Sequence, residues 1–214
     1  MAGYPIQLEI QDMPCVVVGG GSVAHRKVRS LIRAGACVTV ISPALCDGLV
    51  ALREEGAFRH VARNYEAGDE QQYRLVICAT DAPCVNRHIA EAVRAAGGLV
   101  NVIDEPEAGN FTVPAQVSSE KLLLTISTGG ISPAFSRMMR MELEEAYGKV
   151  HGPFLMRLGK WRDEVKGFLP SPAEREAFWR SVLTRDVMQL LGEGKKEEAE
   201  ELVENAISSI RTQS

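Results

Sequence analysis

A glycine-rich turn between an apolar run and an amphipathic helical pattern constrains the fold of this chain most. The run Cys15–Val18 is followed by Gly19, Gly20 and Gly21, and a helical pattern then extends to Ala34. The turn matches G-x-G-x-x-A, in which Gly19 permits the tight turn, Gly21 lets the backbone approach a pyrophosphate, and a small last residue allows close helix packing. Amide groups at the start of the helix would face the anion. The pattern predicts a dinucleotide-binding βαβ unit, and the alternative is a glycine-rich turn without a ligand.

Strands and helices are predicted to alternate over the first hundred residues. Besides the first strand, we expect strands at residues 6–10, 37–41, 58–62, 75–79 and 99–103, with helices at 23–34, 45–52 and 83–96. The segment Ile6–Ile10 alternates apolar and polar residues and is predicted as an edge strand, whereas the continuous apolar runs are typical of strands buried on both faces. This order predicts an α/β fold with a doubly wound parallel sheet.

The pattern changes after Asp104. Two β segments are predicted at residues 111–117 and 122–126, and Ser132-Pro133 begins a helix with proline at its first position. Beyond Val150 the sequence predicts helices alone, including a capping box at Ser171–Glu174 and an amphipathic helix at 195–210. We therefore expect a Rossmann dinucleotide-binding domain at 1–110, a separate α+β segment at 111–149 and a helical domain at 150–214.

Composition excludes several classes of protein. The net charge of −4 argues against a nucleic-acid-binding protein, because neutralising phosphates requires clustered Lys and Arg. No apolar run approaches the roughly 18 residues of a membrane span, and the N-terminus lacks a signal pattern. Five cysteines without a C-x-x-C pair indicate a reducing compartment, so we expect a cytoplasmic protein. The four histidines show no metal-ligand spacing, and no bound metal is predicted.

Residues just beyond two of the predicted strands indicate the cofactor. About 20 residues beyond the glycine turn, where an acidic residue usually binds the ribose, the chain has Ile41-Ser42-Pro43-Ala44. There is also no Arg to accept a 2′-phosphate. The sequence therefore favours NAD over NADP, without the acidic residue that would select NAD. Thr80 lies after a buried strand where the other half of the cofactor would pass, although it could equally cap the next helix.

Two polar residues, Asn101 and Asp104, lie at the end of the last predicted strand of the sheet. Ligands of open α/β sheets bind at the carboxyl ends of the strands, so Asp104 could accept a proton as a hydride leaves the substrate. It could equally cap the turn at Glu105-Pro106.

A second glycine turn, Thr128-Gly129-Gly130, runs into a helix that carries Arg137 and Arg140 three residues apart. Free amides and two guanidinium groups can bind a carboxylate or phosphate, and the alternative is a solvated helix with ordinary surface arginines. The neighbouring Met138, Met139 and Met141 are interpreted as core or interface residues.

Five motifs occur in an order that resembles a known family. They are Pro5-Ile6, GGGSVAHRK at 19–27, CATD at 78–81, NVID at 101–104 and STGGISPAFSR at 127–137. Over roughly its whole length the chain resembles the precorrin-2 dehydrogenase/sirohydrochlorin ferrochelatase family, the N-terminal part of bacterial siroheme synthase.

The resemblance implies oxidation of precorrin-2, a tetrapyrrole with eight carboxylates, by NAD to give sirohydrochlorin. In bifunctional members the same cleft then inserts ferrous iron. The functional aspartate of the family maps onto Asp104, and its dinucleotide contacts map onto Ser22, Val23, Pro43 and Ala44. The polyanionic substrate would be bound by Asn101, Thr128, Gly129, Arg137 and Arg140.

The resemblance also implies a homodimer in which the segment after residue 110 is exchanged and helps to close the cleft. Thr128 stands where bifunctional members have serine, so iron insertion stays open, as do the choice of iron or cobalt and of a siroheme or cobalamin branch. A non-catalytic dinucleotide-sensing module is the alternative function.

Overall fold

The computed structural model describes residues 3–212, which divide into two compact units. Tyr4–Val113 form one unit, and the chain from Pro114 onward forms the other. Each unit has its own secondary structure and its own packing.

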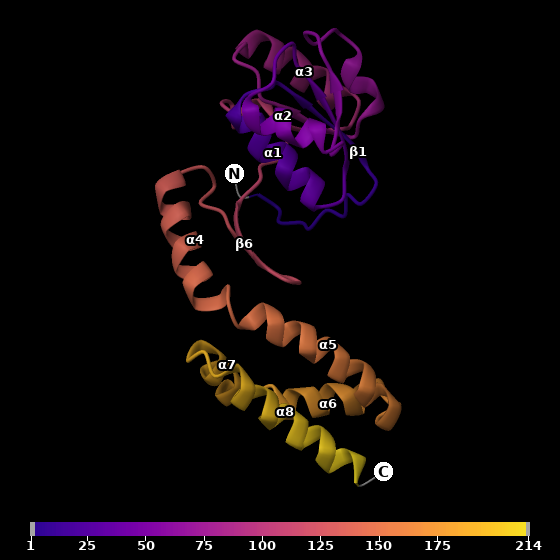
Figure 1. Ribbon diagram of the computed structural model, residues 1–214, viewed down its shortest axis with the longest axis vertical. Helices are drawn as coiled ribbons and strands as arrows, with labels where there is room; N and C mark the ends of the chain where they lie inside the picture. Colours follow the sequence, from indigo (N-terminus) through magenta and orange to yellow (C-terminus); the bar gives the residue numbers. More distant parts are fainter. Residues whose placement is uncertain (1–2, 213–214) are drawn as a thin grey trace. The chain divides into compact units, whose positions relative to one another are not determined.

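The first unit is built on a five-stranded parallel sheet, with the strand order β3-β2-β1-β4-β5 (Figure 1). The strands are β1 Pro14–Val18, β2 Cys37–Ile41, β3 Arg59–Val61, β4 Leu75–Cys78 and β5 Leu99–Val102. They are the continuous apolar runs of the sequence, and their register is regular, with Val17 opposite Val40 and Ile77. The order reverses between β1 and β4, which is the switch point where open α/β sheets bind ligands.

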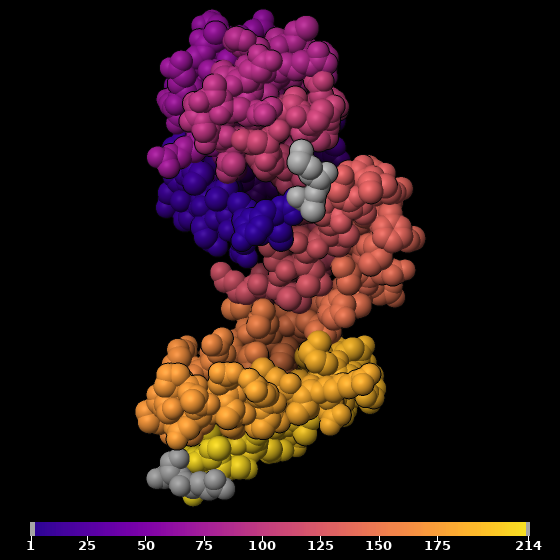
Figure 2. Space-filling model, turned by 180° about the vertical axis from the view of Figure 1, so that it is seen from behind, coloured from indigo at the N-terminus to yellow at the C-terminus, as the bar shows by residue number. Residues whose placement is uncertain are grey.

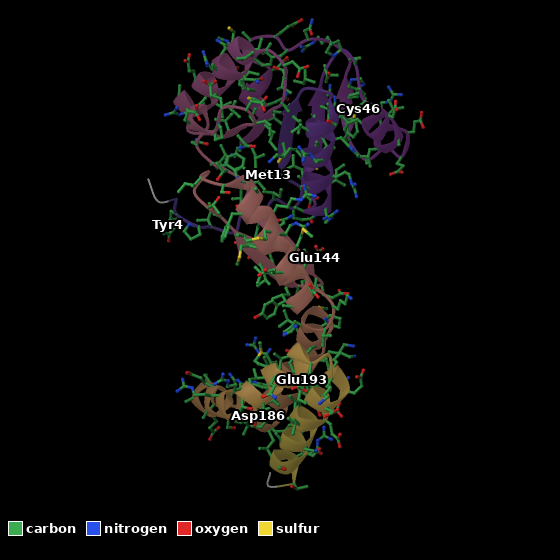
Figure 3. All side chains as sticks on the ribbon, turned by 90° about the vertical axis from the view of Figure 1, so that its left-hand side faces the viewer. Tyr4, Met13, Cys46, Glu144, Asp186 and Glu193 are labelled. Carbon is green, nitrogen blue, oxygen red and sulfur yellow. The ribbon has the colours of Figure 1, made fainter. Side chains whose placement is uncertain are left out.

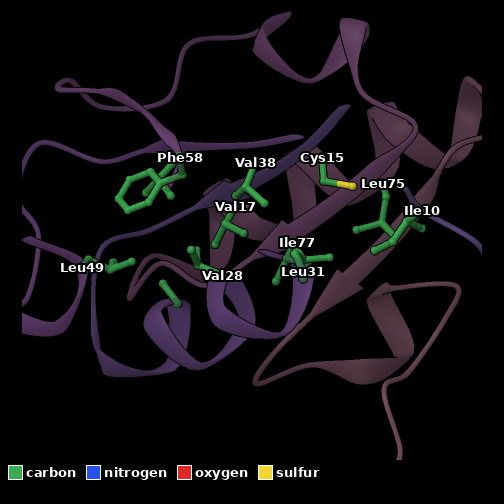
Figure 4. Close-up of a cluster of buried hydrophobic side chains, with 12 residues drawn as sticks. Ile10, Cys15, Val17, Val28, Leu31, Val38, Leu49, Phe58, Leu75 and Ile77 are labelled. Atoms are coloured by element: carbon green, nitrogen blue, oxygen red, sulfur yellow. The ribbon is translucent and has the colours of Figure 1, made fainter. Parts of the chain in front are cut away.

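Helices cover both faces of this sheet. They are α1 Ser22–Arg33, α2 Asp47–Glu54 and α3 Pro83–Ala95, with short 3-10 turns η1 at Asp69–Gln72 and η2 at Pro106–Ala108. Val17 packs with Val28 and Leu49 on the face covered by α1 and α2, the cluster drawn in Figure 4. Its neighbour Val16 points the other way and packs with Ile89 of α3. The predicted doubly wound α/β fold is confirmed.

The predicted edge strand at Ile6–Ile10 is wrong. The segment pairs with none of the described strands, and Tyr4 and Ile6 are 89% and 67% exposed. In Figure 3 the Tyr4 side chain lies out in the open. Only Ile10 is buried, in the cluster of α1 and β1. Alternation predicts which side chains share a face, but a strand also needs a neighbouring backbone to pair with, and that is not encoded in the pattern.

The second unit begins with an antiparallel pair of strands, β6 Ala115–Ser119 and β7 Leu122–Ile126, followed by helix α4 Pro133–Tyr147. The strand expected from residue 111 begins at Ala115 instead. Phe111 packs against the core of the first unit, and its carbonyl oxygen accepts a hydrogen bond from Asn101, so it is held as part of the loop after β5. Ser132 caps α4 as predicted, because its hydroxyl oxygen accepts a hydrogen bond from the Phe135 amide at 3.2 Å.

Four helices complete the second unit, as predicted for the chain beyond Val150. They are α5 His151–Phe168, α6 Pro172–Val182, α7 Arg185–Gly192 and α8 Lys196–Arg211, which form the orange and yellow surface in Figure 2. Phe154, Trp161, Val165 and Val203 form their core. The predicted capping box is incomplete: Ser171 precedes α6, but its side chain makes no capping hydrogen bond. Within residues 3–212 no helix is both long enough and apolar enough to cross a membrane.

Candidate functional site

The glycine turn after β1 joins the ends of three strands. The Gly19 amide donates to the Ile41 carbonyl at the end of β2, at 2.9 Å. Gly19 has a φ of 125°, and a Cβ on it would overlap the Ala79 carbonyl oxygen after β4. Only glycine combines this backbone conformation with such a close approach, so the predicted role of Gly19 in the tight turn is confirmed.

Gly20 is the glycine whose role the motif did not predict. A Cβ on this residue would overlap the Ala44 carbonyl oxygen, and the Gly20 carbonyl accepts a hydrogen bond from the Cys46 amide at 2.8 Å. The turn after β1 is therefore packed directly on the loop after β2. The motif treats this position as variable, and the contact joins residues distant in the chain, so nothing local in the sequence indicates it.

Gly21 is different because it faces open space. It is the N-cap of α1 with extended backbone, and a Cβ on it would meet nothing within 4 Å. No side chain caps this helix, and its first turn has no acidic residue. The first amide groups of α1, including those of Ser22 and Val23, are therefore left to bind an anion, aided by the helix dipole. The backbone and the space before it fit a dinucleotide diphosphate.

The positive side chains of α1 add to this field. Arg26 is exposed and Lys27 is half-buried. Burial, and secondarily the positive charge of Arg26, lower the pKa of Lys27. Both residues lie within two turns of the glycines, so an anion at the start of α1 is also attracted by nearby cations.

The loop after β2 carries Pro43 and Ala44, which are exposed beside Gly20. Two contacts of Ser42 hold this loop. The Ser42 hydroxyl donates to the Ala44 carbonyl at 2.7 Å, and the His60 ring nitrogen Nε2 lies 2.9 Å from the Ser42 carbonyl. With no charged side chain between Ile41 and Ala44, this loop offers a neutral, mainly backbone surface to a ligand.

Thr80 shapes the loop after β4. Its hydroxyl donates to Asn86 Oδ1 at 2.7 Å and accepts from the Ala82 amide at 3.2 Å, while Asn86 Nδ2 donates to the Thr80 carbonyl at 3.0 Å. These bonds hold the loop before α3, but the N-cap of α3 is Ala82 and the helix has no side-chain cap, so Thr80 is not the cap that the alternative expected. Its contact with a cofactor stays a prediction.

Asp104 lies just beyond β5 with an exposed carboxylate. No described residue gives it a hydrogen bond or an ion pair, and the short turn η2 begins after Glu105 without a side-chain cap. Asp104 therefore does not cap the turn at Glu105-Pro106. The carboxyl ends of β1 and β5 lie on the same edge of the sheet, because all five strands are parallel. Gly21 and Asp104 therefore belong to one edge of one unit.

Three contacts fix the loop that carries Asp104. Asn110 Oδ1 accepts from the Val100 amide at 2.8 Å, and its Nδ2 donates to the Gly98 carbonyl at 2.8 Å. Glu105 lies 2.7 Å from Arg87 Nε of α3, and this guanidinium lowers the pKa of Glu105. The chain is therefore held before Asp104, at Gly98 and Val100, and after it, at Glu105.

Asn101 is 5% exposed, within β5. Its Nδ2 donates to the Phe111 carbonyl at 3.1 Å, while its buried Oδ1 has no partner among the described residues. The bond to Phe111 is a further tie on the Asp104 loop, and the unpartnered oxygen is buried within the sheet.

The remaining predicted residues belong to the second unit. The Thr128 hydroxyl lies 3.1 Å from the Ser136 hydroxyl and accepts from the Ser132 amide at 3.3 Å, so it organises its own turn. Gly129 has a φ of 61° with open space where a Cβ would be. Arg137 is exposed and has no acidic partner among residues 3–212. Arg140 pairs with Glu144, which is labelled in Figure 3, so the surface-arginine alternative describes Arg140 better.

No metal site accompanies these residues. Across residues 3–212 no three His, Cys, Asp or Glu side chains are grouped so that they could hold a metal ion.

Comparisons with known proteins agree with this geometry. Residues 6–115 match a family model described as putative NAD(P)-binding, and residues 151–207 match the sirohaem synthase dimerisation region. The siroheme synthase of Thioalkalivibrio sulfidiphilus is 36% identical over 206 residues, which cover 96% of this chain and 42% of that protein. The siroheme synthase of Methylococcus capsulatus is 36% identical over 209 residues, with 98% and 44% covered.

A solved structure has the same fold. It is named SirC, precorrin-2 dehydrogenase, and it aligns with a TM-score of 0.79 at 23% identity, covering 95% of this chain and 100% of that one. The chain spans less than half the length of the siroheme synthases that it matches. The chain belongs to the putative NAD(P)-binding family that matches residues 6–115, and it is similar over nearly its whole length to part of the siroheme synthases.

Proposed function

We propose that this chain oxidises precorrin-2 to sirohydrochlorin with NAD. One observation carries the proposal: the exposed, unpartnered carboxylate of Asp104 lies on the same edge of the sheet as the open glycine turn at Gly21. The relatives named siroheme synthase and the fold of a precorrin-2 dehydrogenase support this substrate.

The turn after β1 holds the dinucleotide. Gly19 forms the tight turn, Gly21 lets the backbone approach the diphosphate, and the amides of Ser22 and Val23 donate to it. Pro43 and Ala44 line the adenosine side with a neutral surface, which suits NAD because no Arg is present for a 2′-phosphate. Thr80 closes the site from the loop after β4. When NAD is bound there, it supplies the hydride acceptor.

Asp104 takes the proton that precorrin-2 loses. Its carboxylate receives no hydrogen bond from the described residues, so both oxygens are available to the substrate. The ties from Asn101, Asn110 and Arg87 keep its loop in place, and a fixed position is what a general base requires. General base catalysis contributes roughly 10²–10⁴ to the rate.

The carboxylates of the substrate require cations and amide groups. In the second unit Arg137 is free of acidic partners among the described residues, and the turn at Gly129 has open space before it. Arg140 would have to exchange Glu144 for a substrate carboxylate, and Thr128 supports the turn. Asn101 acts indirectly: its Nδ2 donates to the Phe111 carbonyl, and its buried Oδ1 is an acceptor that cannot pair with a carboxylate.

Iron insertion would be a second step on the same carboxylate, with ferrous iron as co-substrate and Asp104 accepting the pyrrole protons. The hydroxyl of Thr128 already bonds within its turn, to Ser132 and Ser136. Dehydrogenation is therefore supported by more residues than iron insertion is.

The working unit is proposed to be a homodimer in the cytoplasm. Helix α4 buries none of its residues, and Phe135, Met138 and Met141 are about half exposed along it. An apolar stripe of this kind marks an interaction surface. The match of residues 151–207 to a dimerisation region agrees with association of this unit. Replacing Phe135 with Asp should give monomers in light scattering, and an unchanged dimer would exclude α4 from the interface.

The direct test of function mixes the protein with precorrin-2 and NAD without oxygen. We expect NADH absorbance and the spectrum of sirohydrochlorin to appear together, and addition of ferrous iron then tests the second step. Tight binding of NAD without any NADH formation would instead favour the dinucleotide-sensing module.

A further inference from the structure

Helices α5 and α6 line an open groove that the proposed reaction does not use. Its volume is about 650 Å³, within the roughly 300–1,000 Å³ of small-molecule sites. From α5 it is lined by Leu158, Arg162 and Lys166, which recur every four residues and so share one face of the helix. From α6 it is lined chiefly by Arg175 and Trp179. Both helices belong to the same compact unit.

Apolar side chains line part of the groove. Leu158 and Trp179 are half-buried, and Leu183 is 40% exposed at the end of α6. The Trp179 indole is braced by Phe178, whose ring lies edge-on with centroids 5.0 Å apart. A braced indole offers a face on which a planar ring can stack.

The rim is positively charged. Four cations and one acid line it, and two of the cations are neutralised locally: Arg180 pairs with Glu176 at 2.6 Å, and Lys166 pairs with Asp163 at 2.7 Å. Arg162 forms no ion pair among the described residues, although the Asp163 carboxylate interacts with it electrostatically. With four cations against Glu176 and Asp163, the groove keeps a net positive charge beside its apolar side chains.

Arg175 adds a second charge of this kind. Its guanidinium donates to the Leu169 carbonyl at 2.8 Å, and also to that of Pro170. These bonds to neutral backbone hold the side chain at the turn between α5 and α6 without cancelling its charge. The groove thus presents two guanidinium groups that can accept carboxylates as partners.

We propose that this groove is a second, non-catalytic binding site for a planar macrocycle that carries several carboxylates. The ring stacks on Trp179 and Leu183, and the carboxylates pair with Arg162 and Arg175. The existence of the site rests on the groove itself, and the choice of a carboxylated tetrapyrrole rests on the proposed function. Such a site holds substrate or product outside the edge of the sheet where the dinucleotide binds.

Uroporphyrin, a stable tetrapyrrole with eight carboxylates, is a suitable probe for this protein. Its binding is followed by its visible absorption and by calorimetry, which gives the number of sites per chain. Arg162→Glu should weaken one class of sites by roughly tenfold or more, because a charge-assisted pair is lost and a repulsion is added. Trp179→Ala should weaken the same class.

Lys160→Glu is the matched control. Lys160 lies on α5, is exposed and does not line the groove, and its replacement changes the net charge of the chain equally. It should alter the affinity less than about twofold, since distant exposed charges are screened by salt. Far-UV circular dichroism and urea unfolding, measured in parallel, report whether the helices of the second unit are folded in each variant.

Three results would overturn the proposal. One is equal weakening by Arg162→Glu and Lys160→Glu, which would indicate non-specific attraction. Another is unchanged binding by Trp179→Ala and Arg162→Glu. The third is a shift from dimer to monomer in Arg162→Glu without loss of porphyrin affinity, which would assign the groove to a subunit contact.

The NADH assay separates this site from the proposed function. Arg162→Glu should oxidise precorrin-2 at the rate of the unmodified protein when the substrate is saturating. Uroporphyrin binding that depends on Arg162, in a protein that forms no NADH, would keep the site and remove the proposed function. NADH formation without Arg162-dependent binding would do the reverse.

Discussion

The imidazole of His151 lies edge-on against the Tyr147 ring, with the centroids 4.8 Å apart, where α4 gives way to α5. The ring is 8% exposed, and its Nδ1 has no hydrogen-bond partner among the described residues. Burial lowers the pKa of His151 from its ordinary value of 6.5. The folded protein therefore favours the neutral ring.

This burial predicts that the second unit loses stability in mild acid. Above pH 6.5 the ring is neutral in both the folded and the unfolded chain, so it imposes no penalty. As the pH falls below 6.5, the unfolded chain binds the proton first, and the free energy of unfolding decreases by at most about 1.4 kcal/mol per pH unit from this group. The decrease ends when the folded protein also binds the proton.

Urea unfolding at about pH 7.5 and about pH 5.5 measures the effect, because few carboxylates titrate in that range. His151→Phe keeps an aromatic ring and removes the titration, so its stability should change less between the two pH values. The other three histidines are present in both proteins. An identical pH dependence in the two proteins would show that His151 does not cause it.

Adjacent glycines of the turn after β1 should respond differently to alanine. Gly20→Ala places a methyl group against the Ala44 carbonyl, and because backbone must move, it should destabilise the first unit by about 1–3 kcal/mol. Gly21→Ala meets no atom within 4 Å and should cost less than about 1 kcal/mol, but it should weaken NAD binding by filling the space of the diphosphate. Thermal unfolding and NAD titration together distinguish the two. Normal NAD affinity in a folded Gly21→Ala would remove the diphosphate from this position.

Much of the first unit could be predicted because its strands are buried on both faces. A short, continuous apolar run between two turns, such as Cys37–Ile41, is typical of a buried strand. The strand predicted at residues 37–41 has the same bounds as β2. The tight turn at Gly19 could also be predicted, because its glycine motif is local in the sequence. The role of Gly20 and the contacts that hold the Asp104 loop could not be predicted, because they join residues that are distant in the chain, such as Asn101 and Phe111.

One wrong prediction and two site predictions that stay open have the same origin. The alternation at Ile6–Ile10 predicted a strand, but pairing depends on a neighbouring backbone that the pattern does not specify. Arg140 matched an anion-binding pattern equally well, but its neighbour one turn later is Glu144, and the two pair. Thr80 fitted two roles, and only the structure showed its bonds to Asn86 and Ala82.

Two serines that look alike as helix caps should differ in their contribution to stability. Ser132→Ala removes the bond to the Phe135 amide and should destabilise the second unit by about 0.5–2 kcal/mol. Ser171→Ala removes no capping bond and should cost less than about 0.5 kcal/mol. Urea unfolding of both variants checks the pair. Equal losses would mean that Ser171 caps α6 in solution.

Replacement of Asp104 is the sharpest test of the proposed oxidation of precorrin-2. Asp104→Asn keeps the size of the side chain but cannot accept the proton as a carboxylate does, so the rate of NADH formation from precorrin-2 should fall by about 10²–10⁴ while NAD affinity is unchanged. Glu107→Gln, on the same loop and also exposed, is the control and should retain full activity. The measurement is the anaerobic rate of NADH formation by the three proteins at saturating NAD. A slow Asp104→Asn beside an active Glu107→Gln is the predicted result, and undiminished NADH formation by Asp104→Asn would contradict the account.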